Sequence, residues 1–251
     1  AFWGKISPVL FPIVGTLKNN RYRHQGIEYQ LPRHGFAREK QFDLTEKSET
    51  SVTFSLQSTA ETLEVYPFAF GFSINYSVEE DKLSVQYRVK NRGAGPMFFS
   101  VGGHPAFKLP LADGTAYNDY TLRFEKEETA PRWPISNDGL IEKEGFPFLD
   151  STNELPLSKD LFKTDAVVLK NLKSKRVALF SAKTPHGLDF FFDGFSYLGL
   201  WAASGADFLC IEPWCGIADS VDADGELESK EGIVALPEGD EFTATWTGKF
   251  Y

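Results

Sequence analysis

The chain has 251 residues, enough for one large hydrophobic core or two smaller ones. Its formal net charge is −9, and no Lys/Arg cluster offers the positive surface that nucleic acid requires, so we expect no nucleic-acid partner. The sequence contains no apolar run of the roughly 20 residues that cross a bilayer and no recognisable signal peptide. We therefore expect no membrane association and a cytoplasmic location.

Short segments with the alternation of β-strands dominate the chain. Residues Ser51–Gln57 alternate between polar and apolar side chains, and so do Phe72–Val78 and Lys82–Val89, which a turn-like EED separates. The latter two segments predict a hairpin with one face toward solvent. Further strand patterns occur at Tyr120–Phe124, Val177–Ser181, Leu188–Phe192, Phe208–Glu212 and Phe242–Phe250. Together they predict an all-β protein built as a large antiparallel sandwich.

Signals for other structure are few. Residues Glu61–Tyr66 and Lys159–Phe162 each suit a short helical turn. The segment Asn137–Leu157 is rich in Pro, Gly and acidic residues and is interpreted as a long surface excursion. No linker or internal repeat divides the chain, so residues 1–251 are expected to form a single domain.

Each of the four histidines is a candidate for chemistry. His24 lies in a polar stretch and His186 in a turn sequence, so both are expected at the surface. His104 follows an apolar strand and two glycines in SVGGHPAF, and His34 precedes a glycine in LPRHGFAR. Paired glycines allow the backbone to pass close to a bulky group. A reactive role and a buried structural role remain open for His34 and His104.

A carboxylate ends an unbroken apolar strand in the sequence FLCIEPW, where Glu212 is followed by proline and tryptophan. An inward-facing carboxylate on such a strand needs a partner, because burial of an unpaired charge is costly. The alternatives are an outward-facing side chain and a structural ion pair. With His104, Glu212 suggests a general acid and a general base on a rigid β scaffold.

Other chemistry finds less support. The sequence lacks GxGxxG, the Walker A motif and GxSxG, so neither a nucleotide cofactor nor a serine nucleophile is indicated. Cys210 and Cys215 are interpreted as reduced thiols, and no H-x-H or H-x₃-H spacing supports a metal site. We expect neither a metal nor a cofactor. Glycosidase chemistry needs two carboxylates, which the sequence does not pair; the candidates are Asp165, Asp189, Asp193 and Glu212.

Several blocks, in this order, resemble the aldose 1-epimerase (galactose mutarotase-like) family, in particular its LacX-like branch. The blocks are SPVLFPIVGTLKNN, LPRHGFAR, SVGGHPAFKLP, FLCIEPWCGIADS and EGIVALPEGDEFTATW. The resemblance implies a β-supersandwich with a sugar lying across a concave sheet face. It also implies that the strands that precede the first block in the family are missing from this chain, which has no initiator Met.

The resemblance implies that His104 is the catalytic acid and Glu212 the base, with His34 as a second histidine that binds the substrate. Glu212 would remove the proton of the C1 hydroxyl while His104, charged near neutral pH, protonates the ring oxygen. A neighbouring carboxylate favours the charged imidazole.

Four further residues are assigned less directly. Asp165 is matched to an aspartate that binds sugar hydroxyls, and Arg38 to an arginine near the phosphate in hexose-6-phosphate mutarotase relatives. Trp201 and Trp214 are candidates for stacking on the sugar, with core packing as the alternative. Relatives commonly carry an arginine where this chain has Thr16, which bears on the substrate or on the level of activity.

We therefore predict a mutarotase that needs no cofactor and takes a small-molecule sugar or sugar phosphate; the sequence indicates neither the particular sugar nor an oligomeric state. One alternative is a hexose-6-phosphate mutarotase, with Arg33, Arg38 and Lys18 as phosphate contacts. A non-catalytic carbohydrate-binding domain is another, and a glycosidase or lyase on a sandwich fold is a third.

Overall fold

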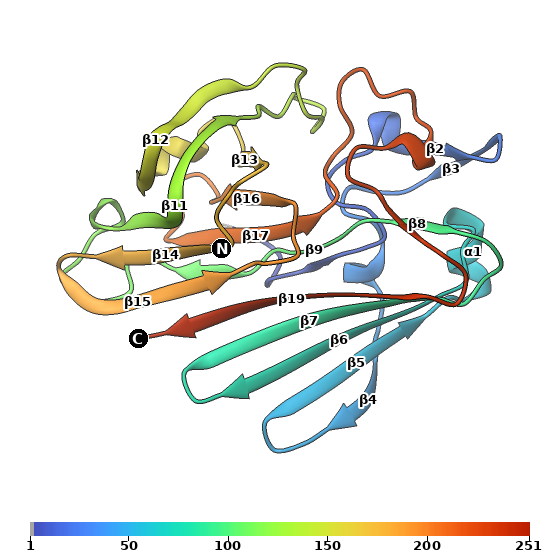
Figure 1. The fold of residues 1–251 in the computed structure, drawn as a ribbon, viewed down its shortest axis with the longest axis horizontal. Helices are drawn as coiled ribbons and strands as arrows, with labels where there is room; N and C mark the ends of the chain where they lie inside the picture. The colour runs from blue at the N-terminus through green and yellow to red at the C-terminus, as the bar shows by residue number, and fades with distance from the viewer. Residues whose placement is uncertain (1–2) are drawn as a thin grey trace.

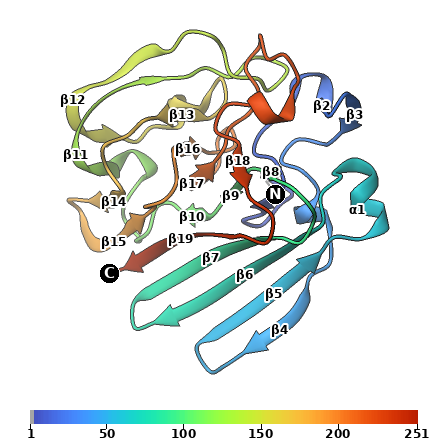
Figure 2. The same ribbon diagram turned by 45° about the vertical axis from the view of Figure 1, so that its right-hand side comes forward.

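Two antiparallel sheets contain most of the strand residues of the computed structural model, which describes residues 3–251. The larger sheet curves as an arc around the smaller one (Figures 1 and 2). Within the described residues, the larger sheet has nine strands and the smaller one six. This arrangement is the predicted antiparallel β-supersandwich.

In spatial order, the nine-stranded sheet consists of β12 (Phe146–Pro156), β11 (Thr121–Arg132), β14 (Arg176–Ser181), β15 (Thr184–Phe191), β19 (Glu241–Phe250), β7 (Lys82–Asn91), β6 (Phe70–Glu79), β5 (Ser51–Gln57) and β4 (Asp43–Lys47). The six-stranded sheet consists of β1 (Val9–Leu10), β9 (Val101–Gly103), β17 (Phe208–Cys215), β16 (Tyr197–Trp201) and β13 (Val167–Lys170), with β10 (Ala106–Lys108) paired to β17.

Smaller elements complete the described part of the chain. Strand β18 (Val234–Leu236) pairs with β8 (Met97–Phe99), and β2 (Arg21–His24) pairs with β3 (Ile27–Gln30). One α-helix, α1 (Ala60–Val65), occurs in residues 3–251, and none of the helices described there is long and apolar enough to cross a membrane. The 3₁₀ turns are Lys18–Asn20, Ala37–Glu39, Tyr117–Asp119, Lys159–Phe162 and Leu227–Ser229.

The predicted hairpin is confirmed as β6 and β7, which pair in continuous antiparallel register from Phe70↔Asn91 to Glu79↔Lys82. On one face of β6, Phe70, Phe72 and Ile74 are buried. On the other face, Ser73, Asn75 and Ser77 keep partial contact with solvent. The period-two pattern thus reports one buried and one wet face, as expected for a half-buried antiparallel sheet.

The interpretation of Asn137–Leu157 as a surface excursion is wrong over its second half. Residues Phe146–Pro156 form β12, which pairs with β11 at the edge of the larger sheet. Leu149 and Leu155 are buried, and their burial holds the strand on the sheet. An edge strand leaves one row of backbone groups unpaired, so it tolerates the prolines that obscured its pattern.

Aromatic and aliphatic side chains together form the core between the two sheets. A continuous core of buried residues includes members of both sheets and of the segments that join them. The ring of Phe11, which follows β1, stacks on that of Phe72 of β6 at 4.4 Å between centroids. Aromatic contacts of this kind pack the smaller sheet against the larger one.

Candidate active site

Two adjacent strands of the smaller sheet bring the predicted acid and base together. His104 directly follows β9, and Glu212 lies in β17, which pairs with β9 through Trp214↔Gly102. The Nε2 atom of His104 lies 3.2 Å from the Oε1 atom of Glu212. Glu212 is 2% exposed and His104 9% exposed, so this contact is almost entirely shielded from solvent.

The glycines of the SVGGH motif allow β9 to approach its neighbours closely. A Cβ atom added to Gly102 would lie 2.7 Å from Cδ1 of Trp214, and one added to Gly103 would lie 2.7 Å from the Tyr87 hydroxyl. Larger residues would push His104 away from β17. The close approach inferred from the two glycines is therefore present, and Trp214 is one of the bulky groups involved.

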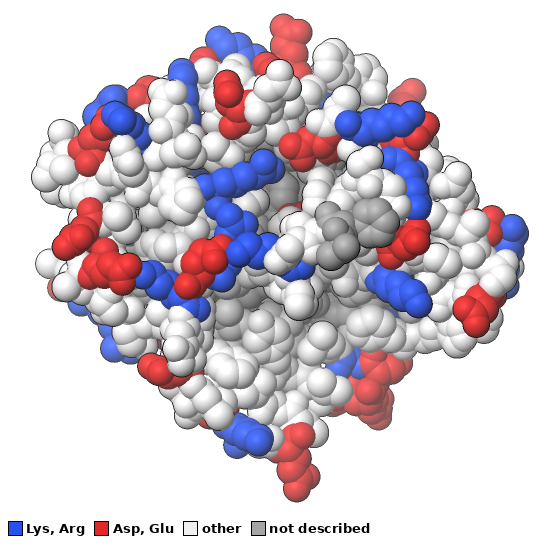
Figure 3. Space-filling model, turned by 180° about the vertical axis from the view of Figure 1, so that it is seen from behind, with Lys and Arg blue, Asp and Glu red and all other residues white. Residues whose placement is uncertain are grey.

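His104 and Glu212 border a cavity of about 480 Å³, a size typical of sites for small molecules. On the face seen in Figure 3, Lys and Arg side chains gather beside a hollow. All the site residues predicted from the sequence line the cavity, and they are His34, Arg38, His104, Asp165, Trp201, Glu212 and Trp214.

His34 is held in one orientation by the backbone of Gly15. The Gly15 N–H donates to Nδ1 of His34 at 3.1 Å, and the His34 N–H donates to the Gly15 carbonyl at 2.8 Å. Because Nδ1 accepts a hydrogen bond, the proton of the neutral ring belongs on Nε2. The two imidazole centroids of His34 and His104 lie 6.1 Å apart. His34 therefore suits the role of a hydrogen-bond donor to a ligand near His104.

Burial sets the charge of the three ionisable groups at the cavity floor. It lowers the pKa of His104 to about 3, lowers the pKa of His34 well below its usual value and raises the pKa of Glu212 well above its usual value. The nearby Arg33 further lowers both histidine values, and it opposes the shift of Glu212. Burial therefore opposes the charged imidazole expected near neutral pH, because desolvation is the largest influence on the pKa of His104.

Aromatic rings surround His104. The ring of Trp3 lies 4.8 Å from the imidazole centroid, and that of Trp201 lies 5.6 Å away in an edge-on arrangement. Trp214 is only 6% exposed and packs on Gly199, where an added Cβ would lie 2.4 Å from the indole. Trp3 and Trp201 thus border the cavity as walls, whereas most of Trp214 belongs to the core. Trp3 was missed because no pattern surrounds it in the sequence.

Basic side chains border the cavity on one side. Arg33, Arg38 and Lys163 line it, and an Arg33 nitrogen lies 4.0 Å from Oδ2 of Asp165. Asp165 has a φ of 142°, a strained value for a residue with a side chain, as is common at ligand sites. Lys18 is not among the lining residues; its ammonium contacts the carbonyl of residue 223, so its assignment as a phosphate contact is wrong.

Thr16 is buried beside the cavity rather than facing it. Its exposed fraction is 8%, and an added Cβ on Gly139 would lie 2.7 Å from its hydroxyl oxygen. Gly139 lines the cavity. A longer side chain at position 16 would therefore collide with the segment around Gly139 unless that segment moved. The short side chain of Thr16 leaves room for this segment, so the residue at position 16 affects the shape of the cavity near Gly139.

Among the other histidines, His186 is exposed as expected, but His24 is not. The residue is 8% exposed, its ring packs on Phe68 at 4.7 Å between centroids, and its Nδ1 atom contacts Glu228 at 2.7 Å. The prediction for His24 is wrong because its strand, β2, lies against other parts of the fold, which the polar local sequence did not indicate.

One group of residues has the chemistry of a metal site. His104, Cys210 and Glu212 present ligand atoms within 4.8 Å of one another, a donor set that zinc accepts. Burial raises the pKa of the Cys210 thiol, so the thiolate that would bind a metal is disfavoured. Cys210 and Cys215 are both free and buried.

Comparisons with known proteins identify the same resemblance independently. The profile of the aldose 1-epimerase family matches residues 2–234. Protein LacX (chromosomal) of Lactococcus lactis subsp. lactis is 36% identical over 245 residues, an alignment that covers 94% of this chain and 82% of LacX.

Solved structures agree with the sequence comparisons. The galactose mutarotase related enzyme of Lactobacillus acidophilus superposes with a TM-score of 0.92 at 36% identity, covering 99% of this chain and 84% of that one. A galactose mutarotase-like protein of Lactobacillus casei superposes with a TM-score of 0.92 at 29% identity, covering 100% and 86%.

Proposed function

Because this chain belongs to the aldose 1-epimerase family, we propose that it is a mutarotase that interconverts the α and β anomers of a hexose. The observation that carries the proposal is the 3.2 Å contact between His104 and Glu212 at the floor of the cavity. An imidazole and a carboxylate at this distance can hold and exchange a proton. No other reactive group is required for anomer exchange.

The reaction opens and recloses the sugar ring. Glu212 removes the proton of the C1 hydroxyl while His104 protonates the ring oxygen, so the C1–O5 bond breaks and a C1 aldehyde forms. Rotation about C1–C2 presents the other face of the carbonyl. His104 then recovers its proton from the O5 hydroxyl as O5 attacks C1, and Glu212 returns a proton to O1. The protein ends in its starting state.

The pair needs one proton in total, whichever group holds it. In the protein without a ligand, burial favours neutral Glu212 and neutral His104, the proton being on the carboxyl group. Catalysis on the closed ring needs the same single proton on the imidazole instead. Only its transfer over the 3.2 Å contact separates the two forms. Polar groups of a bound sugar would favour the charged form by replacing lost water.

This proton count predicts an unusual pH dependence. We expect kcat/KM for anomer exchange to change by no more than about threefold between pH 7 and pH 5. The reason is that the pKa of His104 is lowered to about 3, so a second proton does not enter the pair as the pH falls through this range. Rates from NMR exchange across the pH range test this. A decline with a midpoint near 6.5, the ordinary imidazole value, would contradict it.

The function itself is tested by the rate of anomer exchange. Freshly dissolved α-glucose or α-galactose is followed by polarimetry at a catalytic protein concentration, and we expect acceleration in proportion to that concentration. Sugar binding without acceleration would instead identify a carbohydrate-binding domain. Release of reducing ends from an oligosaccharide would identify a glycosidase, for which Asp165 supplies a second carboxylate in the cavity.

A second candidate substrate is a hexose 6-phosphate, which the basic border formed by Arg33, Arg38 and Lys163 favours. This candidate predicts that glucose 6-phosphate raises Tm more than glucose does at equal concentration. It also predicts that Arg33→Gln removes most of the difference, because Arg33 is half-exposed and available to a phosphate. Thermal denaturation measures both effects. Equal shifts, or a larger shift with glucose, would rule this candidate out.

A further inference from the structure

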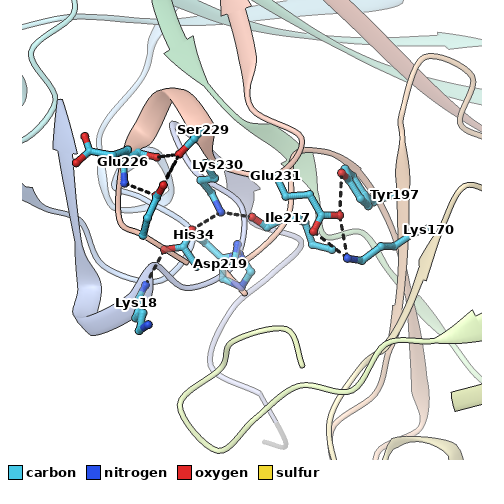
Figure 4. Close-up of polar contacts among 12 residues, drawn as sticks. Lys18, His34, Lys170, Tyr197, Ile217, Asp219, Glu226, Ser229, Lys230 and Glu231 are labelled. Carbon is cyan, nitrogen blue, oxygen red and sulfur yellow. Dashed lines mark hydrogen bonds and ion pairs between the residues drawn. The ribbon is translucent and has the colours of Figure 1, made fainter. Parts of the chain in front are cut away.

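A lysine is buried directly behind the cavity, although no part of the proposed reaction uses it. The side chain of Lys230 is 3% exposed and that of Asp219 is 5% exposed. The Lys230 ammonium donates to Oδ1 of Asp219 at 2.8 Å and to the carbonyl of Ile217. Figure 4 shows Lys230 reaching between these two partners. A buried pair of this kind is expensive to desolvate, and removing one partner would leave the other charge buried without compensation.

Asp219 joins three separate segments of the chain. Its second carboxylate oxygen accepts the backbone N–H of Lys18 at 2.9 Å, and its own N–H donates to the Thr16 carbonyl at 2.9 Å. Its carbonyl accepts the N–H of Ile141 at 2.8 Å. With the bond from Lys230, every hydrogen-bonding group of Asp219 has a partner. The residue therefore fixes the segments around positions 16, 141 and 217 relative to one another.

Each of these three segments contributes to the cavity wall. Ile141, Ile217 and Ala218 line the cavity, as does Gly15. Gly15 packs so closely on Ala218 that an added Cβ would lie 2.4 Å from the alanine Cβ. The backbone of Gly15 also makes two hydrogen bonds with His34, one to its ring Nδ1 and one from its backbone N–H. A displacement at Asp219 would thus pass through Ala218 and Gly15 to the imidazole.

We propose that Asp219 and Lys230 are positioning residues that hold this wall of the sugar site and set the orientation of His34. The proposal rests on the proposed function of the same cavity. Glu212 lies on β17 and His104 directly follows β9, so the pairing of these two strands positions both residues instead. The buried pair therefore acts on substrate binding rather than on the proton transfers. Its loss is expected to raise KM and to change kcat little.

A second lysine offers a matched control. The side chain of Lys170 is 9% exposed and pairs with Glu231 at 2.8 Å, a contact that Figure 4 also shows. Glu231 is the residue that follows Lys230 in the sequence. Lys170 additionally lies over the ring of Trp133, 3.9 Å from its centroid. It shares the size, charge and low exposure of Lys230, and none of its described contacts involves Asp219 or Gly15.

The experiment compares Lys230→Met, Asp219→Asn and Lys170→Met with the wild-type protein, well below each Tm. For the first two we expect KM to rise about tenfold and kcat to change less than threefold, since small displacements of a binding group have effects of this order. We expect Lys170→Met to leave both constants unchanged. Asp219→Asn preserves the shape of the side chain and keeps the test possible if Lys230→Met does not fold.

A second readout does not depend on catalysis. In ¹⁵N-histidine NMR spectra, wild-type His34 is expected to show a protonated Nε2 and a hydrogen-bonded, unprotonated Nδ1. Asp219→Asn and Lys230→Met should shift these signals, and Lys170→Met should not. If the wild-type protein fails to accelerate anomer exchange, the proposed function fails and these signals alone decide the positioning role. The positioning role would be overturned if folded Asp219→Asn and Lys230→Met had a lowered Tm but unchanged His34 signals and an unchanged KM.

Discussion

Replacing Glu212 with Gln is expected to lower kcat/KM for anomer exchange by about 10²–10⁴-fold, with KM nearly unchanged. Glutamine retains the shape of the side chain and can still contact His104, but it cannot accept the proton of the C1 hydroxyl. The proton that the pair shares is lost with the carboxyl group. Polarimetry and NMR exchange measure the rate, and titration with the sugar measures binding.

Although Glu212→Gln is expected to lower the rate, it is not expected to lower the stability of the protein above neutral pH. Burial raises the pKa of Glu212 above its ordinary value of 4.5, so its contribution to folding is fully present below pH 4.5 and is lost as the pH rises. An amide does not ionise and avoids this loss. We therefore expect Tm of the variant at pH 8 to equal or exceed that of the wild-type protein.

Glu128→Gln is the matched control for this prediction. Glu128 is also 2% exposed, but its carboxylate accepts the backbone N–H groups of Lys173 and Ser174, outside the cavity. We expect this variant to lose stability and to retain the full rate. Retention of more than a tenth of the rate by Glu212→Gln would remove Glu212 from the mechanism.

His104→Asn is expected to reduce kcat/KM by a similar factor of about 10²–10⁴. Asparagine cannot transfer a proton to the ring oxygen at neutral pH, and its shorter side chain does not reach Glu212 in the same way. Loss of the ring contacts with Trp3 and Trp201 should also cost about 1–3 kcal/mol of stability. Rates are compared at a temperature at which both proteins are folded.

His186→Asn controls for the substitution itself, because His186 is exposed and lies outside the cavity. It should retain the wild-type rate and Tm. The double variant of His104 and Glu212 should be no slower than the slower single variant, since both residues serve one proton transfer system. Strictly additive losses would show that the two groups act independently and would contradict a shared proton.

The regular strands could be predicted because their signal is local. The bounds of β5 coincide with the predicted Ser51–Gln57, and the hairpin of β6 and β7 extends the predicted segments by two residues at Asn91 and at Phe70. Alternation of side chains depends only on neighbouring residues and on which face of the sheet is buried. β12 was missed because its edge position permits prolines that normally interrupt a strand.

The candidate site was predicted in part. The motifs around His104, Glu212 and His34 identified residues that do line one cavity, because glycines and an apolar strand are local signs of a crowded backbone. Asp219 and Lys230 gave no such sign, since they lie in a charged stretch that resembles an exposed loop. Only the packing of distant segments around them excludes water.

The amino-acid sequence by itself determined the β-rich architecture, the identity of the acid and base candidates and the family. These properties depend on residue type and on short-range spacing. Tertiary structure decided that His104 and Glu212 lie 3.2 Å apart and that burial disfavours the charged form of both. The charge of a buried group depends on the water that is removed from around it. That quantity is set by side chains from many parts of the chain and is not encoded in any one motif.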